Sequence, residues 1–292
     1  VPKIMFSGLN YDGSNFQTIM EISEANGTEV GTGFKISGPE QPAHDKGNGY
    51  RSSDGFFIPT YDAFGTARPS LWRIIANGSG VTWAKRDSAN TSKRIKGVAS
   101  GNSKIYISGD IDDTLLYGRI AQLSLSTGQP DWEKKYTADS YDCYGQGVTT
   151  DTSGNTYVAF STGGGTAPRP MYLLKINSSG VVQWQKKISS SIGSISVEEM
   201  TSDSSEFLYF TGGLNSRNWV MKYPMDGSID TTVNIPLTGG TITIEPASGS
   251  LTDYELHTWG AVTESFSSYY DSQNWAASNA IGSTKTGWEV IA

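Results

Sequence analysis

The residues best suited to chemistry are tyrosines followed directly by aspartates, which recur in segments between short apolar runs. An aromatic ring stacks on the C–H face of a sugar, while a carboxylate accepts hydrogen bonds from sugar hydroxyl groups. We therefore expect a loop face that binds a glycan or a receptor, although such residues are also common in loops that bind nothing. The candidate ligand-binding residues are Tyr11, Asp12, Tyr61, Asp62, Phe64, Asp112, Tyr117, Tyr141, Asp142, Tyr144 and Arg169.

The same acids allow an enzymatic alternative. Asp12, Asp62, Asp142 and Glu199 are spaced so that they could approach a common axis, and paired acids hydrolyse glycosidic bonds. A glycosidase needs a few unique acids, whereas the Tyr-Asp pairs repeat loosely, as expected for repeated binding. We therefore expect no catalytic residues and no enzymatic activity, with a secreted sugar-cleaving enzyme and a free-standing lectin as the alternatives.

Other reactive side chains are few. Asp110, Asp112 and Asp113 lack the glycine and the distal glutamate of a calcium loop. The two histidines, His44 and His257, lie too far apart in sequence to suggest a zinc site. We expect neither a metal nor a cofactor, and the single Cys143 excludes an internal disulfide.

The elements that would position these residues form a repeat. A short apolar run returns at Ser7, Pro59, Ser108, Phe160 and Thr211, in steps of 52, 49, 52 and 51 residues. A hairpin with a turn rich in Gly or Asn follows each run, and a further strand-like segment precedes four of the five runs. Four short strands within about fifty residues are typical of a propeller blade. The sequence predicts an all-β, five-bladed β-propeller of four-stranded antiparallel blades.

The two ends of the repeat suggest how the ring closes. The chain starts at the second strand of a unit, and a surplus strand-like run covers about residues 241–247. We expect this late strand to join the N-terminal blade and to close the ring, which removes exposed sheet edges. The propeller then covers residues 1–249, and residues 250–292 form a tail outside the repeat.

Two repeated features belong to the blades themselves. Trp83, Trp132 and Trp184 recur in phase, and periodic aromatic residues of this kind predict packing between blades. Basic residues follow each tryptophan, and lysines on the outer edge of a blade block pairing with other sheets. We interpret the tryptophans as core and the lysines as edge protection.

The tail is rich in aromatic residues and has too many for a disordered linker. It either packs on the propeller or docks onto a neighbouring subunit, and we expect docking. The candidate assembly residues are Trp259, Phe266, Tyr269, Tyr270, Trp275 and Trp288.

Two segments resemble known proteins. The units at 147–158 and 173–186 resemble the bacterial β-propeller repeats called SBBP repeats, over roughly residues 1 to 245. The segment 222–229 is similar to the ends of propeller-containing structural proteins of marine bacteriophages. The resemblance implies a non-enzymatic, virion-associated module such as a tail fibre. Its loop face would contact a host-surface glycan or another virion protein, and its tail would mediate assembly or self-association. The location would be the virion, or otherwise secreted.

Charge and hydropathy exclude other partners. The formal net charge is −7 and the sequence pI is about 4.9, which argues against binding nucleic acid over a broad surface. No apolar run approaches the length of a membrane-spanning helix, so we expect no membrane insertion.

Overall fold

The chain folds as an all-β protein. The computed structural model describes residues 3–11, 15–23, 33–37, 50–52, 54–61, 69–74, 81–88, 92–112, 115–139, 141–203, 206–215, 217–229, 232–237, 239–262, 265–269 and 289–291. For the strands up to Ser37 and from Ser265 onward, the description covers the backbone alone. These residues contain strands and turns but no helix, and hence no helix that could span a membrane.

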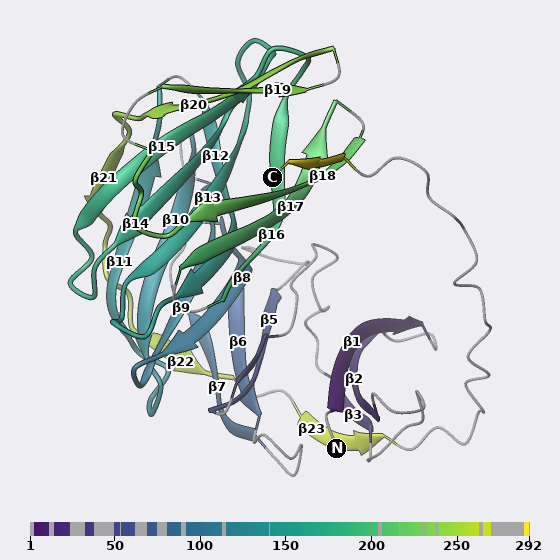
Figure 1. Ribbon diagram of the computed structural model, residues 1–292. Helices are drawn as coiled ribbons and strands as arrows, with labels where there is room; N and C mark the ends of the chain where they lie inside the picture. The colour runs from purple at the N-terminus through teal and green to yellow at the C-terminus, as the bar shows by residue number, and fades with distance from the viewer. Residues whose placement is uncertain are drawn as a thin grey trace.

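The strands form five sheets, and the strands of each sheet follow one another in spatial order as named below (Figure 1). The first sheet contains β1 (Lys3–Tyr11), β2 (Asn15–Ser23), β3 (Gly33–Ser37) and β23 (Ser265–Tyr269). The second contains β22 (Trp259–Ala261), β7 (Val81–Asp87), β6 (Pro69–Ile74), β5 (Gly55–Tyr61) and β4 (Tyr50–Ser52). The third contains β21 (Ser250–Asp253), β11 (Pro130–Thr137), β10 (Leu116–Ser124), β9 (Lys104–Asp112) and β8 (Ser92–Gly101).

The last two sheets take up the C-terminal part of the repeat. The fourth contains β12 (Asp142–Thr150), β13 (Thr156–Gly163), β14 (Met171–Ile176), β15 (Val182–Ser190), β20 (Gly240–Pro246) and β19 (Val233–Leu237). The fifth contains β16 (Ile195–Ser202), β17 (Phe207–Leu214), β18 (Arg217–Pro224) and β24 (Glu289–Ile291).

The predicted four-stranded unit is confirmed in the second, third and fourth sheets. In each of them, four consecutive strands pair with their sequence neighbours in antiparallel fashion. Among the first strands of the units, β12 of the fourth contacts β8 of the third and β16 of the fifth. Antiparallel sheets arranged around their first strands form a β-propeller fold.

The periodic tryptophans pack between sheets, as the sequence predicts. Trp83 of the second sheet donates its indole N–H to the carbonyl of Leu125, in the turn between β10 and β11 of the third sheet, at 3.0 Å. Trp132 of the third sheet bonds the carbonyl of Ser178 beside the fourth sheet in the same way, at 3.3 Å. The interpretation of these tryptophans as inter-sheet core is therefore confirmed.

The expected closure by residues 241–247 is wrong. β20 pairs with β15 and with β19, both in the fourth sheet, and not with β1. Ile242 and Ile244 are buried in a core shared by the fourth and fifth sheets. The sequence interpretation overlooked β19, whose apolar residues alternate in the same way and make β20 the second half of a hairpin. Among the described strands, no pairing joins the first sheet to the fifth.

The tail follows the outer edges of the sheets. β21 pairs with β11 of the third sheet, β22 with β7 of the second, and β23 with β3 of the first. The tail therefore visits the sheets in the reverse of their chain order, before β24 pairs in parallel with β18 of the fifth sheet. Because β21 and β22 of the tail cover β11 and β7, and β20 covers β15, the basic residues on these strands do not lie at free sheet edges. Lys134 pairs with Asp253 at 2.5 Å, and Lys187 with Glu245 at 3.4 Å.

The predicted assembly residues have different locations. Trp259 is 1% exposed and packs inside this chain's own core, so its ring is not available to another subunit in this structure. Phe266 and Tyr269 belong to β23, for which the structure gives the backbone alone. Tyr270, Trp275 and Trp288 lie outside the described residues.

Candidate functional site

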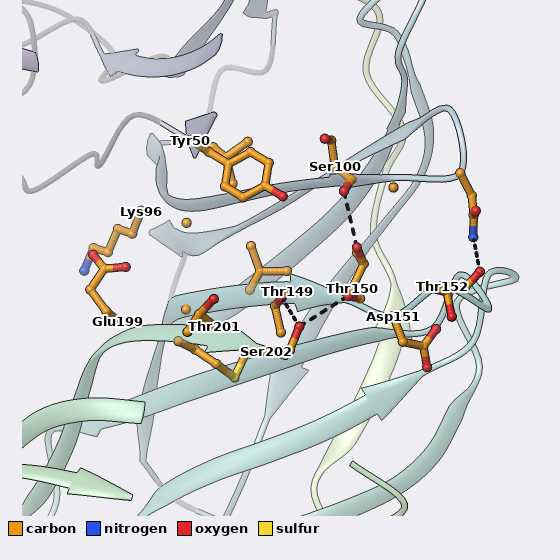
Figure 2. A pocket seen from close by; sticks show the side chains of 17 residues that line it. Tyr50, Lys96, Ser100, Thr149, Thr150, Asp151, Thr152, Glu199, Thr201 and Ser202 are labelled. Carbon is orange, nitrogen blue, oxygen red and sulfur yellow. Dashed lines mark hydrogen bonds between the residues drawn. The ribbon is translucent and has the colours of Figure 1, made fainter. Parts of the chain in front are cut away.

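A cavity of about 620 Å³ opens where the first strands of the units meet (Figure 2). Its walls come from β4, β8, β12 and β16 and the turns that follow them, so four of the five sheets contribute. We call this space the axial cavity. Most side chains that line it are small or hydroxyl-bearing.

Glycines let these inner strands approach one another. A Cβ atom on Gly97 would come within 2.5 Å of the carbonyl oxygen of Gln146. A Cβ atom on Gly147 would come equally close to the Cβ of Met200. Both glycines hold the same position in their repeat units, so the sequence places them where backbones must pass closely.

Hydroxyl groups connect the sheets across the cavity wall. The hydroxyls of Thr149 and Ser202, from the fourth and fifth sheets, are hydrogen-bonded at 3.0 Å. Thr150 donates its hydroxyl to the carbonyl of Ser100 in the third sheet, at 3.3 Å. Figure 2 shows these bonds as a ladder along one side of the cavity. The wall therefore presents oxygen atoms that can donate or accept hydrogen bonds.

One end of the cavity carries Lys96, which is positioned by the buried Asp110 carboxylate and the Tyr144 ring. The Lys96 ammonium lies 3.2 Å from Oδ1 of Asp110 and 5.0 Å from the centre of the Tyr144 ring. The Asp110 side chain is 1% exposed, accepts no hydrogen bond at either oxygen, and has Arg94 at 3.6 Å as a further counter-charge. Figure 2 places Lys96 and Glu199 together at this end.

The carboxylate at the other end has a structural role. Asp151 accepts hydrogen bonds from the backbone N–H groups of Ser153 and Asn155, at 2.9 and 2.8 Å. The hydroxyl of Tyr157 donates to the same carboxylate at 3.0 Å. Burial, and then the charge of Asp151, raises the pKa of Tyr157 above its usual range. Asp151 therefore fixes the turn between β12 and β13.

The predicted ligand-binding residues lie outside the axial cavity where the structure describes them. Tyr144 approaches it through its contact with Lys96. Tyr141 and Asp142 lie against Gly165 and Gly164, so the predicted loop residues do gather near β12 and β13. Burial and the nearby Asp142 raise the pKa of Tyr144.

The other predicted residues that the structure describes with side chains are Asp112, Tyr117 and Arg169, and the charge of Arg169 opposes the rise in the pKa of Tyr144. Asp112 is exposed at the end of β9, and Lys135 lies over the ring of Tyr117 at 4.7 Å. Arg169 is half-buried, and its backbone carbonyl accepts the N–H of Ile195. Tyr11 and Tyr61 end β1 and β5, without described side chains, and Asp12, Asp62 and Phe64 lie outside the described residues.

Sequence reasoning missed most of the cavity lining. Glu199 was expected near the axis and does line the cavity. Lys96 and the hydroxyls of Ser100, Thr149 and Ser202 were not expected there. The available signal was the repeated segment before each apolar run, whose small and hydroxyl-bearing residues identify the innermost strand.

Comparisons with known proteins give limited information. No family model matches the sequence, and no curated protein matches it. A solved structure of a europium-containing methanol dehydrogenase is similar, with a TM-score of 0.46 and 10% identity. The match covers 84% of this chain and 56% of the dehydrogenase. A quinohemoprotein alcohol dehydrogenase from Pseudomonas putida is similar with a TM-score of 0.40 and 10% identity, covering 81% of this chain and 43% of that one.

These comparisons correct the functional expectation from the sequence. The chain spans about half the length of the structures it resembles. Both of them are enzymes and neither is a virion protein, which conflicts with the expected non-enzymatic, virion-associated binding module. Neither comparison shows a relation to SBBP repeats or to bacteriophage proteins. At this identity the likeness concerns the fold and assigns no activity.

Proposed function

We propose that the axial cavity binds a small hydroxylated molecule of about the size of a mono- or disaccharide. The observation that carries this proposal is the convergence of hydroxyl groups from the third, fourth and fifth sheets on one cavity of about 620 Å³. Ligand pockets in proteins span roughly 300–1,000 Å³ and use a few placed polar groups to fix orientation. Ser100, Thr149 and Ser202 supply such groups.

The charges around the cavity favour a neutral ligand. Lys96 is the cation in the lining, and Asp110 compensates its charge at 3.2 Å. A strongly charged ligand would compete with this pair, whereas a neutral hydroxyl can accept a hydrogen bond from the Lys96 ammonium. Glu199, at the same end, offers an acceptor for a ligand hydroxyl.

Hydrolysis by paired acids has weaker support than binding. Glu199 and Asp151 are the two carboxylates of the described lining, and Figure 2 draws them at opposite ends. Asp151 already accepts hydrogen bonds from its own turn and from Tyr157. A glycosidase needs two acids on either side of one bond, so the lining supports recognition of a sugar better than its cleavage.

The proposal includes the five predicted blades, without the closure by residues 241–247 that the sequence predicted. The five sheets act as five blades around this cavity, and the first sheet completes its wall. The order of the sheets along the chain and the contacts of β8 with β12, and of β12 with β16, support this arrangement.

Calorimetric titration of the full chain with neutral mono- and disaccharides tests the proposal. Thr149→Val keeps the shape of the side chain and removes its hydroxyl from the wall. Losing one hydrogen bond costs about 0.5–1.5 kcal/mol, so we expect roughly a two- to twelvefold loss of affinity. Thr243→Val is the matched control, because its hydroxyl bonds Asn234 in the β19–β20 hairpin, away from the cavity.

The same titrations can contradict the proposal. Saturable binding that Thr149→Val weakens and Thr243→Val leaves unchanged supports the axial site. Binding that neither Thr149→Val nor Ser202→Ala alters places the ligand elsewhere. No binding by any sugar in the series excludes a neutral saccharide as the ligand.

A further inference from the structure

The second and third sheets share a buried ionic cluster that the tail covers, and we call this tail-covered seam the groove and the cluster its floor. Lys93 on β8 lies 3.2 Å from Asp87 and 2.9 Å from Glu133. Arg119 on β10 lies 2.8 Å from Asp87 and 3.0 Å from Glu133. All four side chains are at most 1% exposed. Buried charges need such partners because they have lost their contacts with water. The arrangement of these four residues therefore depends on the elements that cover them and exclude water.

Trp259 covers one side of this floor. Its indole lies 5.6 Å from the Arg119 guanidinium, and its backbone pairs with Asp87. The side-chain amide of Gln129 donates to the Trp259 carbonyl at 2.7 Å and accepts its N–H at 3.0 Å. Gln129 therefore bonds both backbone groups of an extended peptide, with an aromatic ring seated beside it.

Tyr254 covers the other side. Its ring centre lies 4.8 Å from the Lys93 ammonium, and its backbone N–H donates to the carbonyl of Glu133 at 3.0 Å. The preceding Asp253 pairs with Lys134 on β11. The groove thus holds an acid, an adjacent tyrosine and a tryptophan five residues later, all from one extended segment.

The backbone of this segment pairs with the two sheets only through short edge strands, beside the side-chain contacts of Tyr254 and Trp259. β21 forms four residue pairs with β11, and β22 forms three with β7. The second and third sheets each keep four strands of their own without the tail. An element attached in this way can be replaced by the identical element of a second copy, which is the basis of domain swapping.

The connection to the ring favours such an exchange. β20 ends at Pro246 in the fourth sheet, and β21 begins at Ser250 in the third. Only residues 247–249 make this crossing, and a Cβ atom on Gly249 would come within 2.2 Å of the Tyr136 hydroxyl. Short, tightly constrained hinges of this kind promote swapping.

We infer that the groove between the second and third sheets is a peptide-binding site that accepts residues 250–262 of a second copy of this chain in place of its own. Copies would then associate by exchanging tails. This inference is independent of the axial cavity, since the first strands of the blades line the cavity and the tail pairs with the last strands β11 and β7.

Two variants of the full chain, each with one added cysteine, test it. Lys134 and Asp253 are opposite one another, and the bond between Tyr254 N–H and Glu133 makes the adjacent pair the hydrogen-bonded one. Non-hydrogen-bonded pairs have Cα atoms about 4.5 Å apart, which lies within the range for a disulfide. When Lys134→Cys and Asp253→Cys chains are unfolded together, refolded and oxidised, this disulfide can form only between two chains.

We expect a covalent dimer whose fraction rises with protein concentration and in which mass spectrometry finds the two introduced cysteines linked. The double variant Lys134→Cys/Asp253→Cys shows that the geometry permits the bond, and each single variant alone reports dimers formed by collision. The unmodified protein shows how much disulfide-linked dimer forms through the native Cys143, which is buried. A double variant that oxidises within one chain, together with a mixture that yields no linked dimer at any concentration, overturns the inference.

Discussion

The indole of Trp184 in the fourth sheet lies directly against Gly227 at the end of the fifth, so that a Cβ on Gly227 would come within 2.6 Å of Nε1. Gly227 also has a φ of +71°, which side-chain-bearing residues rarely adopt. One glycine therefore serves both the turn and the joint between sheets. The same contact recurs one and two sheets earlier, between Trp132 and Gly180 and between Trp83 and Gly128.

Gly227→Ala should destabilise the protein through both effects. The left-handed conformation costs about 1–2 kcal/mol with a Cβ, and crowding of a packed core adds about 1–3 kcal/mol. Gly239→Ala is the matched control, because Gly239 has a φ of +89° with nothing within 4 Å of its Cβ position. Urea unfolding should show a clearly larger loss for Gly227→Ala. Equal losses would mean that the tryptophan contact contributes nothing.

The tryptophan side of this contact between sheets could be predicted from the sequence. The 49- and 52-residue steps between Trp83, Trp132 and Trp184 identify a repeated core position. The turn glycines were predicted from backbone conformation alone. Their contact with the preceding tryptophan depends on how two sheets pack, and this information lies in no local pattern.

Arg119→Met should be strongly destabilising. Lys93, Arg119, Asp87 and Glu133 form the buried ionic cluster described above, which we call the quartet. The variant leaves Asp87 and Glu133 buried, with Lys93 as their remaining cation in the quartet. Removing one partner from a buried ionic cluster typically costs about 3–5 kcal/mol. The control is Lys104→Met, which breaks a surface pair with Asp131 and should cost about 0–1 kcal/mol. Similar unfolding midpoints for the two variants would show that the quartet is not a stability element.

The ends of the chain show where sequence reasoning fails. Ile242 and Ile244 alternate as an edge strand should, but that pattern fits the edge of any sheet. Strands of three to five residues, such as β21 and β22, have too little pattern to select a partner, so tertiary contacts decide their pairing. The sequence therefore identified the tail as a packing or docking element, but it did not predict the path of the tail around the sheets.

Alkaline pH should unfold the protein. Burial raises the pKa of Cys143 to about 12 from its ordinary 9.0, and burial also raises the pKa values of Tyr136, Tyr157 and Tyr172 above 10.0. A raised folded-state pKa in an acid contributes stability that is complete below the unfolded value and is lost as the pH rises above it. Lys93, whose pKa is lowered by burial, acts in the opposite direction.

The acids with a raised pKa, which also include Tyr106 and Tyr144, outnumber Lys93, so the urea midpoint should fall as the pH rises from 9 through 11. Cys143 should also resist iodoacetamide at pH 8.5 in the folded protein and react once the chain is unfolded in urea. A midpoint that rises over this range, or labelling of the folded chain, would contradict the buried assignment.

The candidate site was harder to predict than the fold, for a physical reason. The predicted Tyr-Asp loops come from single connections, and Tyr141, Asp142 and Tyr144 do lie near one another around Gly163–Gly165. The axial cavity instead combines residues about fifty positions apart, such as Ser100, Thr150 and Ser202. Small hydroxyl residues on a strand indicate a cavity only after the strands have been placed around an axis.

Trp259→Ala should loosen the tail and destabilise the fold together. Removing a buried tryptophan ring typically costs about 3–5 kcal/mol, and here it also uncovers Arg119 in the ionic floor. Hydrogen exchange should accelerate first at the amides of Tyr254 and Val262, which pair with the carbonyls of Glu133 and Ala84. Leu256→Ala is the control, since Leu256 is 52% exposed in the same segment. If both variants keep these amides protected, the tail is held by its strand pairing and not by Trp259.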